Sequence, residues 1–149
     1  MFAILAERGR NEFILAARVL LVLLFIIFGW SKLTDYSGTV SEMTTMGAPV
    51  PQISAAIAIV IEFFVGIAIL FGIFTRPLAV VMMAYALATA FIGHHYWTMS
   101  GANQLADEVD FYKNVSIMGG FLLLYVTGAC KYSLDAIFME RSSHGYSVK

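Results

Sequence analysis

Glu62 is the residue whose surroundings most favour chemistry, because it lies alone in a long apolar run. Between Ile53 and Thr75 no other residue carries a charge, and the run is long enough to cross a bilayer. An unpaired carboxylate at the centre of a membrane helix costs roughly 2.5–3.5 kcal/mol or more. The carboxyl group must therefore be paired with a cation, protonated, or in contact with a wet cavity.

The first apolar segment carries two cations on one face, and one of them can approach this acid. Steps of four and three residues place a set of side chains on one helix face: Arg18, Val22, Phe25, Gly29 and Lys32. At 1.5 Å per residue, Glu62 lies roughly 14 Å below one surface and Arg18 about 10 Å deeper. We predict an Arg18–Glu62 ion pair, which is either a clip that fixes helix register or part of a functional site. Snorkelling to the interface is the alternative for both cations.

Further polar residues flank the third connection: His94, His95, Lys113 and Asn114. Consecutive residues of a helix diverge by about 100°, so the two imidazoles cannot both bind one metal while the helix continues. We expect one histidine to face the bundle and predict no metal site. The membrane segments hold no second histidine at a matching position, which argues against a bis-histidine haem.

We predict that these four residues and Lys32 form a polar pocket above Glu62, walled by Phe, Tyr and Met. Such a pocket suits a lipophilic, neutral or anionic planar molecule such as a quinone. Its carbonyl oxygens would accept hydrogen bonds from lysine or histidine, and an acid could supply a proton on reduction.

The composition indicates an integral membrane protein of one domain, residues 1–149. Hydrophobic residues make up 60 % of the chain and charged residues 13 %, whereas a soluble domain has about 25 % charged residues. The net charge of −1 provides no basic field for nucleic acid. Cys130 is the only cysteine, so it cannot form an internal disulfide, and thiol–disulfide exchange needs a second, resolving cysteine. A redox role would therefore need a bound cofactor or a partner protein.

Four runs have the length of a membrane-spanning helix, and we predict an all-α antiparallel four-helix bundle. The predicted helices cover residues 14–33, 53–74, 77–96 and 112–130. The first run follows Arg8 and Arg10, but Arg18 interrupts it and no small-x-small cleavage pattern follows, so we predict a retained helix and no signal peptide.

The connections between these helices differ in length and character. The first, Thr34–Gln52, should hold a short amphipathic helix that Ser37 caps and Gly47 ends. The second is a tight turn, and the third, Trp97–Phe111, is polar and acidic. The segment Ser133–Met139 is predicted to form a short amphipathic helix on the membrane surface.

The distribution of lysine and arginine predicts that both termini face the cytoplasm. In a four-helix topology the side with the termini holds most of the cations: Arg8, Arg10, Arg76, Lys131, Arg141 and Lys149. The opposite side holds Lys32, Lys113 and most of the loop acids. The first connection would then be an outer loop.

An ordered set of motifs runs through the chain: Ala17-Arg18, Phe28-Gly29-Trp30-Ser31-Lys32, Met46-Gly47-Ala48-Pro49, Glu62, Phe71-Gly72-Ile73-Phe74-Thr75-Arg76, Gly93-His94-His95-Tyr96-Trp97, Lys113-Asn114-Val115-Ser116-Ile117, Gly119-Gly120-Phe121-Leu122-Leu123-Leu124, Thr127-Gly128 and Ser133-Leu134-Asp135. In this respect the chain resembles the DoxX family of small four-helix bacterial inner-membrane proteins over nearly its whole length. Members of that family are linked to thiosulfate:quinone oxidoreduction or to resistance against quinones, catechols, oxidants and thiol stress.

The resemblance implies a multi-pass protein of the bacterial inner membrane. The family's recurring polar positions correspond here to Arg18, Lys32, Glu62, His94 or His95, Lys113 and Asn114. We therefore expect a quinone-related redox or oxidative-stress subunit, with Glu62 handling protons or pairing charge and with a membrane or redox partner protein. Two alternatives stay open: a non-catalytic scaffold or assembly partner, and a small transporter that works as a homo-oligomer.

Overall fold

The computed structural model describes residues 7–138, and every regular element among them is helical. The elements are α2 (Arg10–Thr34), α3 (Tyr36–Thr45), α4 (Pro51–Ile59), the π-helix η1 (Val60–Val65), α5 (Gly66–Phe71), α6 (Thr75–Gly93), the 3-10 turn η2 (Tyr96–Thr98) and α7 (Ala102–Thr127). Three helical segments are long and apolar enough to cross a membrane: Arg10–Thr34, Pro51–Phe71 and Thr75–Thr98. This confirms an all-helical protein with several candidate membrane spans.

The second span is one continuous helix made of α4, η1 and α5. It ends at Gly72, whose φ of 71° lies in the left-handed region that favours glycine. The backbone N–H of Ile73 donates to the carbonyl of Ala68 at 2.9 Å, which closes the last turn. The chain reverses within three residues, and α6 begins at Thr75.

Helix α7 begins at Ala102, about ten residues before the predicted start near Tyr112. The polar stretch expected as a loop is therefore helical from residue 102 onward. A helix of 26 residues is about 39 Å long, more than the roughly 30 Å of a hydrocarbon core. Its first turns can thus carry acidic residues beyond the apolar segment. The helix ends at Thr127, because Gly128 at φ 73° and Cys130 at φ 62° leave the helical conformation.

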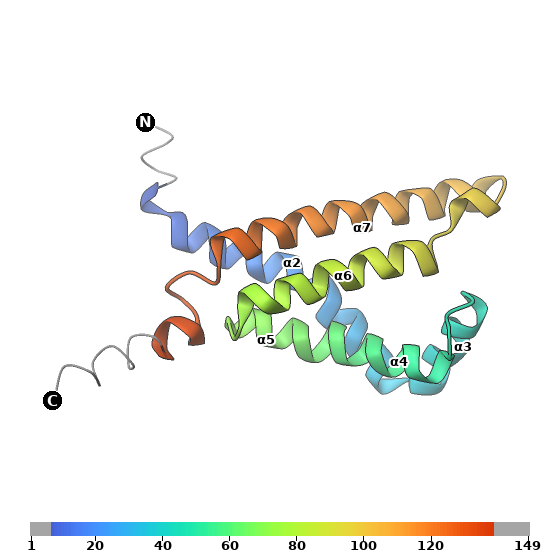
Figure 1. Cartoon of the computed structure of the whole chain (residues 1–149), viewed down its shortest axis with the longest axis horizontal. Coiled ribbons are helices and arrows are strands. Elements are labelled where there is room, and N and C mark those ends of the chain that lie inside the picture. The colour runs from blue at the N-terminus through green and yellow to red at the C-terminus, as the bar shows by residue number, and fades with distance from the viewer. Residues whose placement is uncertain (1–6, 139–149) are drawn as a thin grey trace, which may run out of the picture.

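Two groups of helices make up the fold (Figure 1). Helices α6 and α7 pack along their length as an antiparallel hairpin, and α2 packs against α4, η1 and α5. The core between the groups holds Val22 and Phe25 of α2, Ile69 of α5, Met82 of α6 and Phe121 of α7, each at most 5 % exposed.

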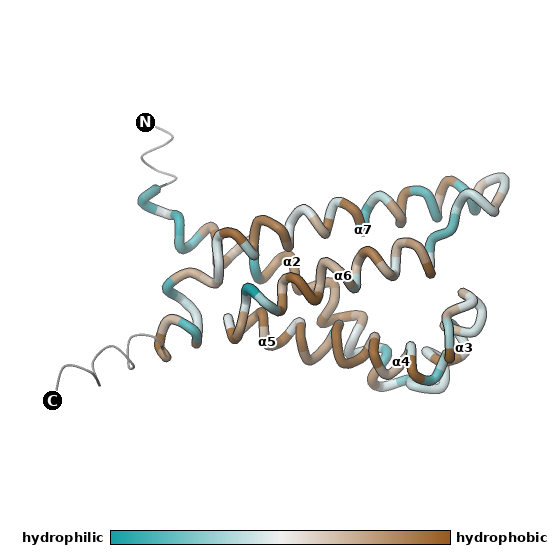
Figure 2. Tube along the Cα trace, viewed as in Figure 1, coloured by the Kyte–Doolittle hydropathy of each residue, from teal (hydrophilic) through white to brown (hydrophobic). Residues whose placement is uncertain are grey.

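The outward faces of the long helices are also apolar, as Figure 2 shows by hydropathy. Large side chains such as Leu20 and Leu123 are 70 % and 68 % exposed. Lipid tails are a favourable environment for such side chains, so these faces are typical of a protein that contacts the bilayer.

The first connection contains the short helix that the sequence predicts, but its cap is different. Asp35, and not Ser37, caps α3, because the Asp35 carboxylate accepts the backbone N–H of Gly38 at 2.9 Å. The hydroxyl of Ser37 lies 3.2 Å from the same carboxylate. After α7, residues 134–138 form a short helical turn. Met139, the last residue of the predicted surface helix, lies outside the described residues.

Candidate functional site

Glu62 lies inside the π-helix η1 and is 7 % exposed. A short stretch of π-helix within an α-helix, called a π-bulge, contains one extra residue, and such insertions occur frequently at functional sites. The carboxylate therefore lies inside the protein. Its two oxygen atoms have partners on two other helices, and these partners define the candidate site.

Lys32 of α2 is the counter-ion of Glu62, with its Nζ atom 2.8 Å from Oε2. This contact depends on Gly29, one turn earlier on the same helix face. An added Cβ at Gly29 would lie 2.6 Å from the backbone nitrogen of Phe63 and 2.9 Å from the Cβ of Glu62. Only a glycine therefore allows α2 to approach η1 closely enough for this ion pair.

Tyr85 of α6 donates its hydroxyl hydrogen to Oε1 of Glu62 at 2.5 Å. Sequence reasoning missed this residue, since a tyrosine within an apolar helix has no composition signal that separates it from a packing residue. Tyr85 is half-buried on the face of α6 that is turned toward η1, so its hydroxyl reaches the carboxylate. Glu62 thus joins α2, η1 and α6.

The site consequently has one carboxylate, one ammonium group and one phenol. The ion pair has no net charge, which reduces the cost of its burial. The side chains of Lys32 and Glu62 are 17 % and 9 % exposed, so the ammonium group is the more accessible of the two charges. The phenol and the ammonium group are both hydrogen-bond donors.

Arg18 does not pair with Glu62, so that prediction is wrong. Its Nη1 atom donates to the carbonyl of Ala129 at 2.5 Å and its Nη2 atom to the carbonyl of Tyr132 at 2.7 Å. These carbonyls belong to the segment after α7, which reaches the α5–α6 turn. Arg18 is 2 % exposed, and its Nε atom has no hydrogen-bond partner among residues 7–138. Arg18 therefore has a separate role in holding the segment that follows α7.

The other predicted site residues, His94, His95, Lys113 and Asn114, form no hydrogen bond or ion pair with Glu62. Lys113 is exposed and pairs with Asp110 of its own helix at 2.5 Å. Asn114 is 8 % exposed on α7. His94 and His95 follow the end of α6, and the Nδ1 atom of His94 lies 3.5 Å from the Asp107 carboxylate.

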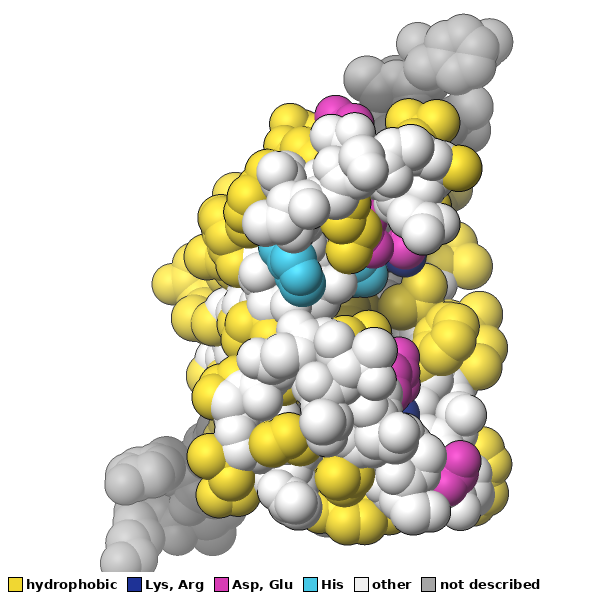
Figure 3. Space-filling view, turned by 90° about the vertical axis from the view of Figure 1, so that its right-hand side faces the viewer, with side chains coloured by type: hydrophobic (Ala, Val, Ile, Leu, Met, Phe, Trp, Pro, Cys, Tyr) yellow, Lys and Arg dark blue, Asp and Glu magenta, His cyan; other side chains and the backbone are white. Residues whose placement is uncertain are grey.

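A hollow separates two lobes at the end of the molecule that carries α3 and the α6–α7 connection (Figure 3). Histidine side chains lie beside it, and acidic and basic side chains gather near its rim. The helix ends at Gly93, so the expected divergence of the two imidazoles along a helix does not apply here. Both imidazoles are half-buried.

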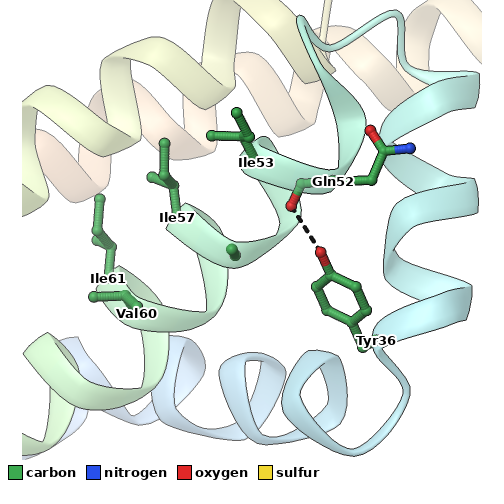
Figure 4. A pocket seen from close by; sticks show the side chains of 7 residues that line it. Tyr36, Gln52, Ile53, Ile57, Val60 and Ile61 are labelled. Atoms are coloured by element: carbon green, nitrogen blue, oxygen red, sulfur yellow. Dashed lines mark hydrogen bonds between the residues drawn. The ribbon is translucent and has the colours of Figure 1, made fainter.

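A shallow apolar groove of about 450 Å³ runs along α4 and the start of η1. In Figure 4, Ile53, Ile57 and Ile61 form a row on one side of this groove. At the polar end of the groove, the Tyr36 hydroxyl donates to the backbone carbonyl of Gln52 at 2.9 Å. The lining ends at Ile61, whereas the side chain of Glu62 points away toward Lys32 and Tyr85.

Comparisons with known proteins identify the family to which the chain belongs. Residues 13–95 match the DoxX family. The chain is 50 % identical over 127 residues to the inner membrane protein YphA of Escherichia coli, covering 85 % of this chain and 91 % of that protein. It is 42 % identical over 128 residues to the inner membrane protein YqjF of the same organism, covering 86 % and 93 %.

A more distant similarity extends to yeast. The ER-derived vesicles protein ERV29 of Saccharomyces cerevisiae is 27 % identical over 129 residues, which cover 87 % of this chain but 34 % of that protein. No solved structure matches the chain.

Proposed function

This chain is a bacterial inner-membrane protein of the DoxX family, and from that premise we propose that Glu62, Lys32 and Tyr85 bind a lipophilic, oxygen-bearing molecule of quinone type. The protein would serve as a subunit in quinone-related redox chemistry or in the defence against oxidants. The observation that carries this proposal is a carboxylate with two hydrogen-bond donors at 2.5 and 2.8 Å inside a π-turn of a membrane-spanning helix.

The proposed topology has four membrane-spanning helices and both termini in the cytoplasm. Helix α7 would be the fourth span, supported by its length and by its antiparallel packing on α6. Arg10, Arg76 and Lys131 lie at the ends of helices that this topology places on the cytoplasmic side, as the positive-inside rule expects. Glu62 and its partners would then lie closer to the outer leaflet.

The proposed chemistry assigns a role to each of the three side chains. A carbonyl oxygen of the ligand accepts a hydrogen bond from Lys32 or Tyr85, both of which are donors. Glu62 accepts the proton that Lys32 or the reduced ligand gives up, and returns it in the reverse direction. Reduction of a quinone takes up two electrons and two protons; in this proposal Lys32 and the protonated form of Glu62 each give one proton to the ligand, and both regain it from water at the membrane surface. The electrons would come from a partner protein, because a single cysteine cannot cycle between dithiol and disulfide.

Trp30 provides a fluorescence test of this proposal, because its ring centroid lies 5.6 Å from that of Phe63, the neighbour of Glu62. Replacing the other tryptophan, Trp97→Phe, leaves Trp30 as the single reporter. A short-chain benzoquinone is titrated into this protein in lipid nanodiscs, and the quenching should saturate. Glu62→Gln should weaken binding at least tenfold, whereas the matched control Lys113→Gln should bind like the parent.

A second candidate function is a scaffold in which the same residues only fix the register of α2, η1 and α6. The observation favouring it is that both oxygen atoms of Glu62 already have protein partners. In that case quenching by the quinone would not saturate, or Glu62→Gln would lower thermal stability while leaving the binding isotherm unchanged. A saturable isotherm that depends on Glu62 would exclude the scaffold role as the whole function.

A further inference from the structure

The two ends of the α6–α7 hairpin are attached to the rest of the protein very differently. We call this hairpin the arm and the segment of residues 129–135 that follows it the latch. Contacts between the arm and α2 lie toward the latch, where the rings of Phe25 and Phe121 are 5.6 Å apart. In Figure 1 the arm diverges from α3 and α4 toward its far tip.

The latch is bound on one side to α2. Arg18 donates to the carbonyls of Ala129 and Tyr132, as described above. The Tyr132 hydroxyl donates to the Glu12 carboxylate at 2.7 Å, and the backbone N–H of Lys131 donates to the side chain of Asn11 at 3.2 Å. Four hydrogen bonds thus connect this segment to a single helix.

The other side of the latch is bound to the α5–α6 turn. The Asp135 carboxylate accepts the backbone N–H groups of Phe74 and Thr75 at 2.9 and 3.2 Å, at the start of α6. The backbone N–H of Asp135 donates to the carbonyl of Gly72 at 3.0 Å. Gly72 has no room for a side chain, because an added Cβ would overlap Ser133 and Arg18. Both helices of the arm, α6 and α7, are therefore anchored at this end.

The arm itself is internally cross-linked at its tip. The ring of Phe111 on α7 lies 5.3 Å from that of Phe91 on α6 and 5.6 Å from that of Tyr96. The contact between His94, which follows α6, and Asp107 of α7 also joins the two sides of the arm. The tip can therefore move as one unit.

Beyond the latch and the shared core, the arm meets the other helices mainly where α6 packs on η1. Helices α3 and α4 pack on each other and on α2 and η1, without extensive packing on α6 or α7. Across residues 7–138, the Tyr85–Glu62 bond is the one hydrogen bond that joins α6 or α7 to the helices from α2 to α5. The hollow in Figure 3 lies at this weakly held end.

We propose that the arm is hinged at the latch, that the Tyr85–Glu62 hydrogen bond holds it closed, and that its opening admits the lipophilic ligand between the tip and α3. The identity of the ligand rests on the proposed function, whereas the movement of the arm is independent of it. A hydroxyl group of the reduced, quinol form of the ligand that takes the place of the Tyr85 hydroxyl as donor to Glu62 would release the arm. Binding and opening would then be coupled through one bond.

Spin-label distances test the hinge without any ligand. The single cysteine is removed by Cys130→Ser, and labelled cysteines are placed at Thr44 of α3 and Leu105 of α7, both exposed. A second pair at Phe13 and Val80, also exposed, reports on the latch end. The protein is reconstituted in nanodiscs of phosphatidylethanolamine and phosphatidylglycerol, and double electron–electron resonance gives the distance distributions.

Tyr85→Phe, which removes only the hydroxyl group, should add a longer-distance population to the Thr44–Leu105 pair and leave the Phe13–Val80 pair unchanged. Tyr125→Phe is the matched control, because Tyr125 is an exposed tyrosine of the arm, and it should leave both pairs unchanged. In Glu62→Gln the amide oxygen can still accept from Tyr85, so the tip should remain mostly closed. The proposal is overturned if Tyr85→Phe leaves the tip pair as in Tyr125→Phe, or if both pairs shift together.

The outcomes separate the hinge from the ligand site. A tip that opens in Tyr85→Phe without saturable quinone binding to the parent protein would support the hinge and refute the proposed ligand. Saturable binding with an immobile tip would support the ligand site and refute the hinge. Because Tyr85→Phe preserves the ring and its packing, the variant should fold, and retained far-ultraviolet circular dichroism verifies this.

Discussion

Gly29→Ala should separate α2 from η1 and break the candidate site without changing any of its polar residues. The added methyl carbon would lie 2.6 Å from the backbone nitrogen of Phe63 and 2.9 Å from the Cβ of Glu62. Non-bonded heavy atoms prefer about 3.5–4.0 Å, so the two helices must move apart by about 1 Å. The obstacle is backbone and a Cβ atom, which cannot rotate away. Overpacking of this kind costs about 1–3 kcal/mol.

The same displacement acts on Lys32, which lies one turn further along α2. Its Nζ–Oε2 distance of 2.8 Å would lengthen past the range in which a hydrogen bond is strong. We therefore expect a lower midpoint of thermal unfolding together with weaker quinone quenching of Trp30 fluorescence. Gly119→Ala is the matched control, because nothing lies within 4 Å of an added Cβ there.

In that control, replacing a helical glycine by alanine should be neutral or stabilising by up to about 1 kcal/mol. Thermal unfolding of both variants in nanodiscs, followed by circular dichroism, gives the comparison. The reasoning is refuted if Gly29→Ala unfolds at the same temperature as Gly119→Ala and retains the parent's binding isotherm.

Three further substitutions have expected outcomes that the same unfolding measurement can check. Tyr85→Phe should cost about 1.5–3 kcal/mol, the contribution of a hydrogen bond to a charged group, while Tyr125→Phe, at an exposed position, should cost much less. Arg18→Met should cost about 3 kcal/mol or more, because one buried and one partly buried carbonyl lose a charged donor; the idea is wrong if Arg76→Met, at an exposed position, is equally destabilising. Gly72→Ala should cost at least about 1–2 kcal/mol, because φ is 71° and L-residues are strained there; unchanged stability would contradict the described latch.

Helical spacing was sufficient to predict the buried face of the first helix. Arg18, Val22, Phe25 and Gly29 are the buried residues of α2, since a face that repeats at steps of three and four residues must meet the neighbouring helices. The isolation of Glu62 in an apolar run likewise predicted its burial. These inferences rest on geometry and solvation within single helices.

The partners of Glu62 could not be predicted in the same way. Depth along parallel axes placed Arg18 near the acid, but a distant segment of the chain supplies two carbonyls to Arg18 instead. Such a contact across more than a hundred residues leaves no trace in local spacing. Tyr85 has no periodic or charge signal, and its role follows only from the position of α6 against the π-turn.

The early start of α7 was missed for a different reason. Acidic residues between Trp97 and Phe111 indicate a solvated segment, but a solvated segment can be helical when its helix extends beyond the membrane. The Asp110–Lys113 pair, three residues apart on α7, is typical of such an exposed helix. Charge therefore did not predict the conformation of this segment, which is helical from Ala102 onward.

Photolabelling with an azido-benzoquinone in nanodiscs tests most directly whether Glu62, Lys32 and Tyr85 form a ligand site. Illumination followed by peptide mass spectrometry should locate the label within η1 or on the facing turns of α2 and α6, and an excess of unlabelled short-chain quinone should abolish it. Label spread over the lipid-facing side chains, unaffected by that excess or by Glu62→Gln, would contradict the assignment.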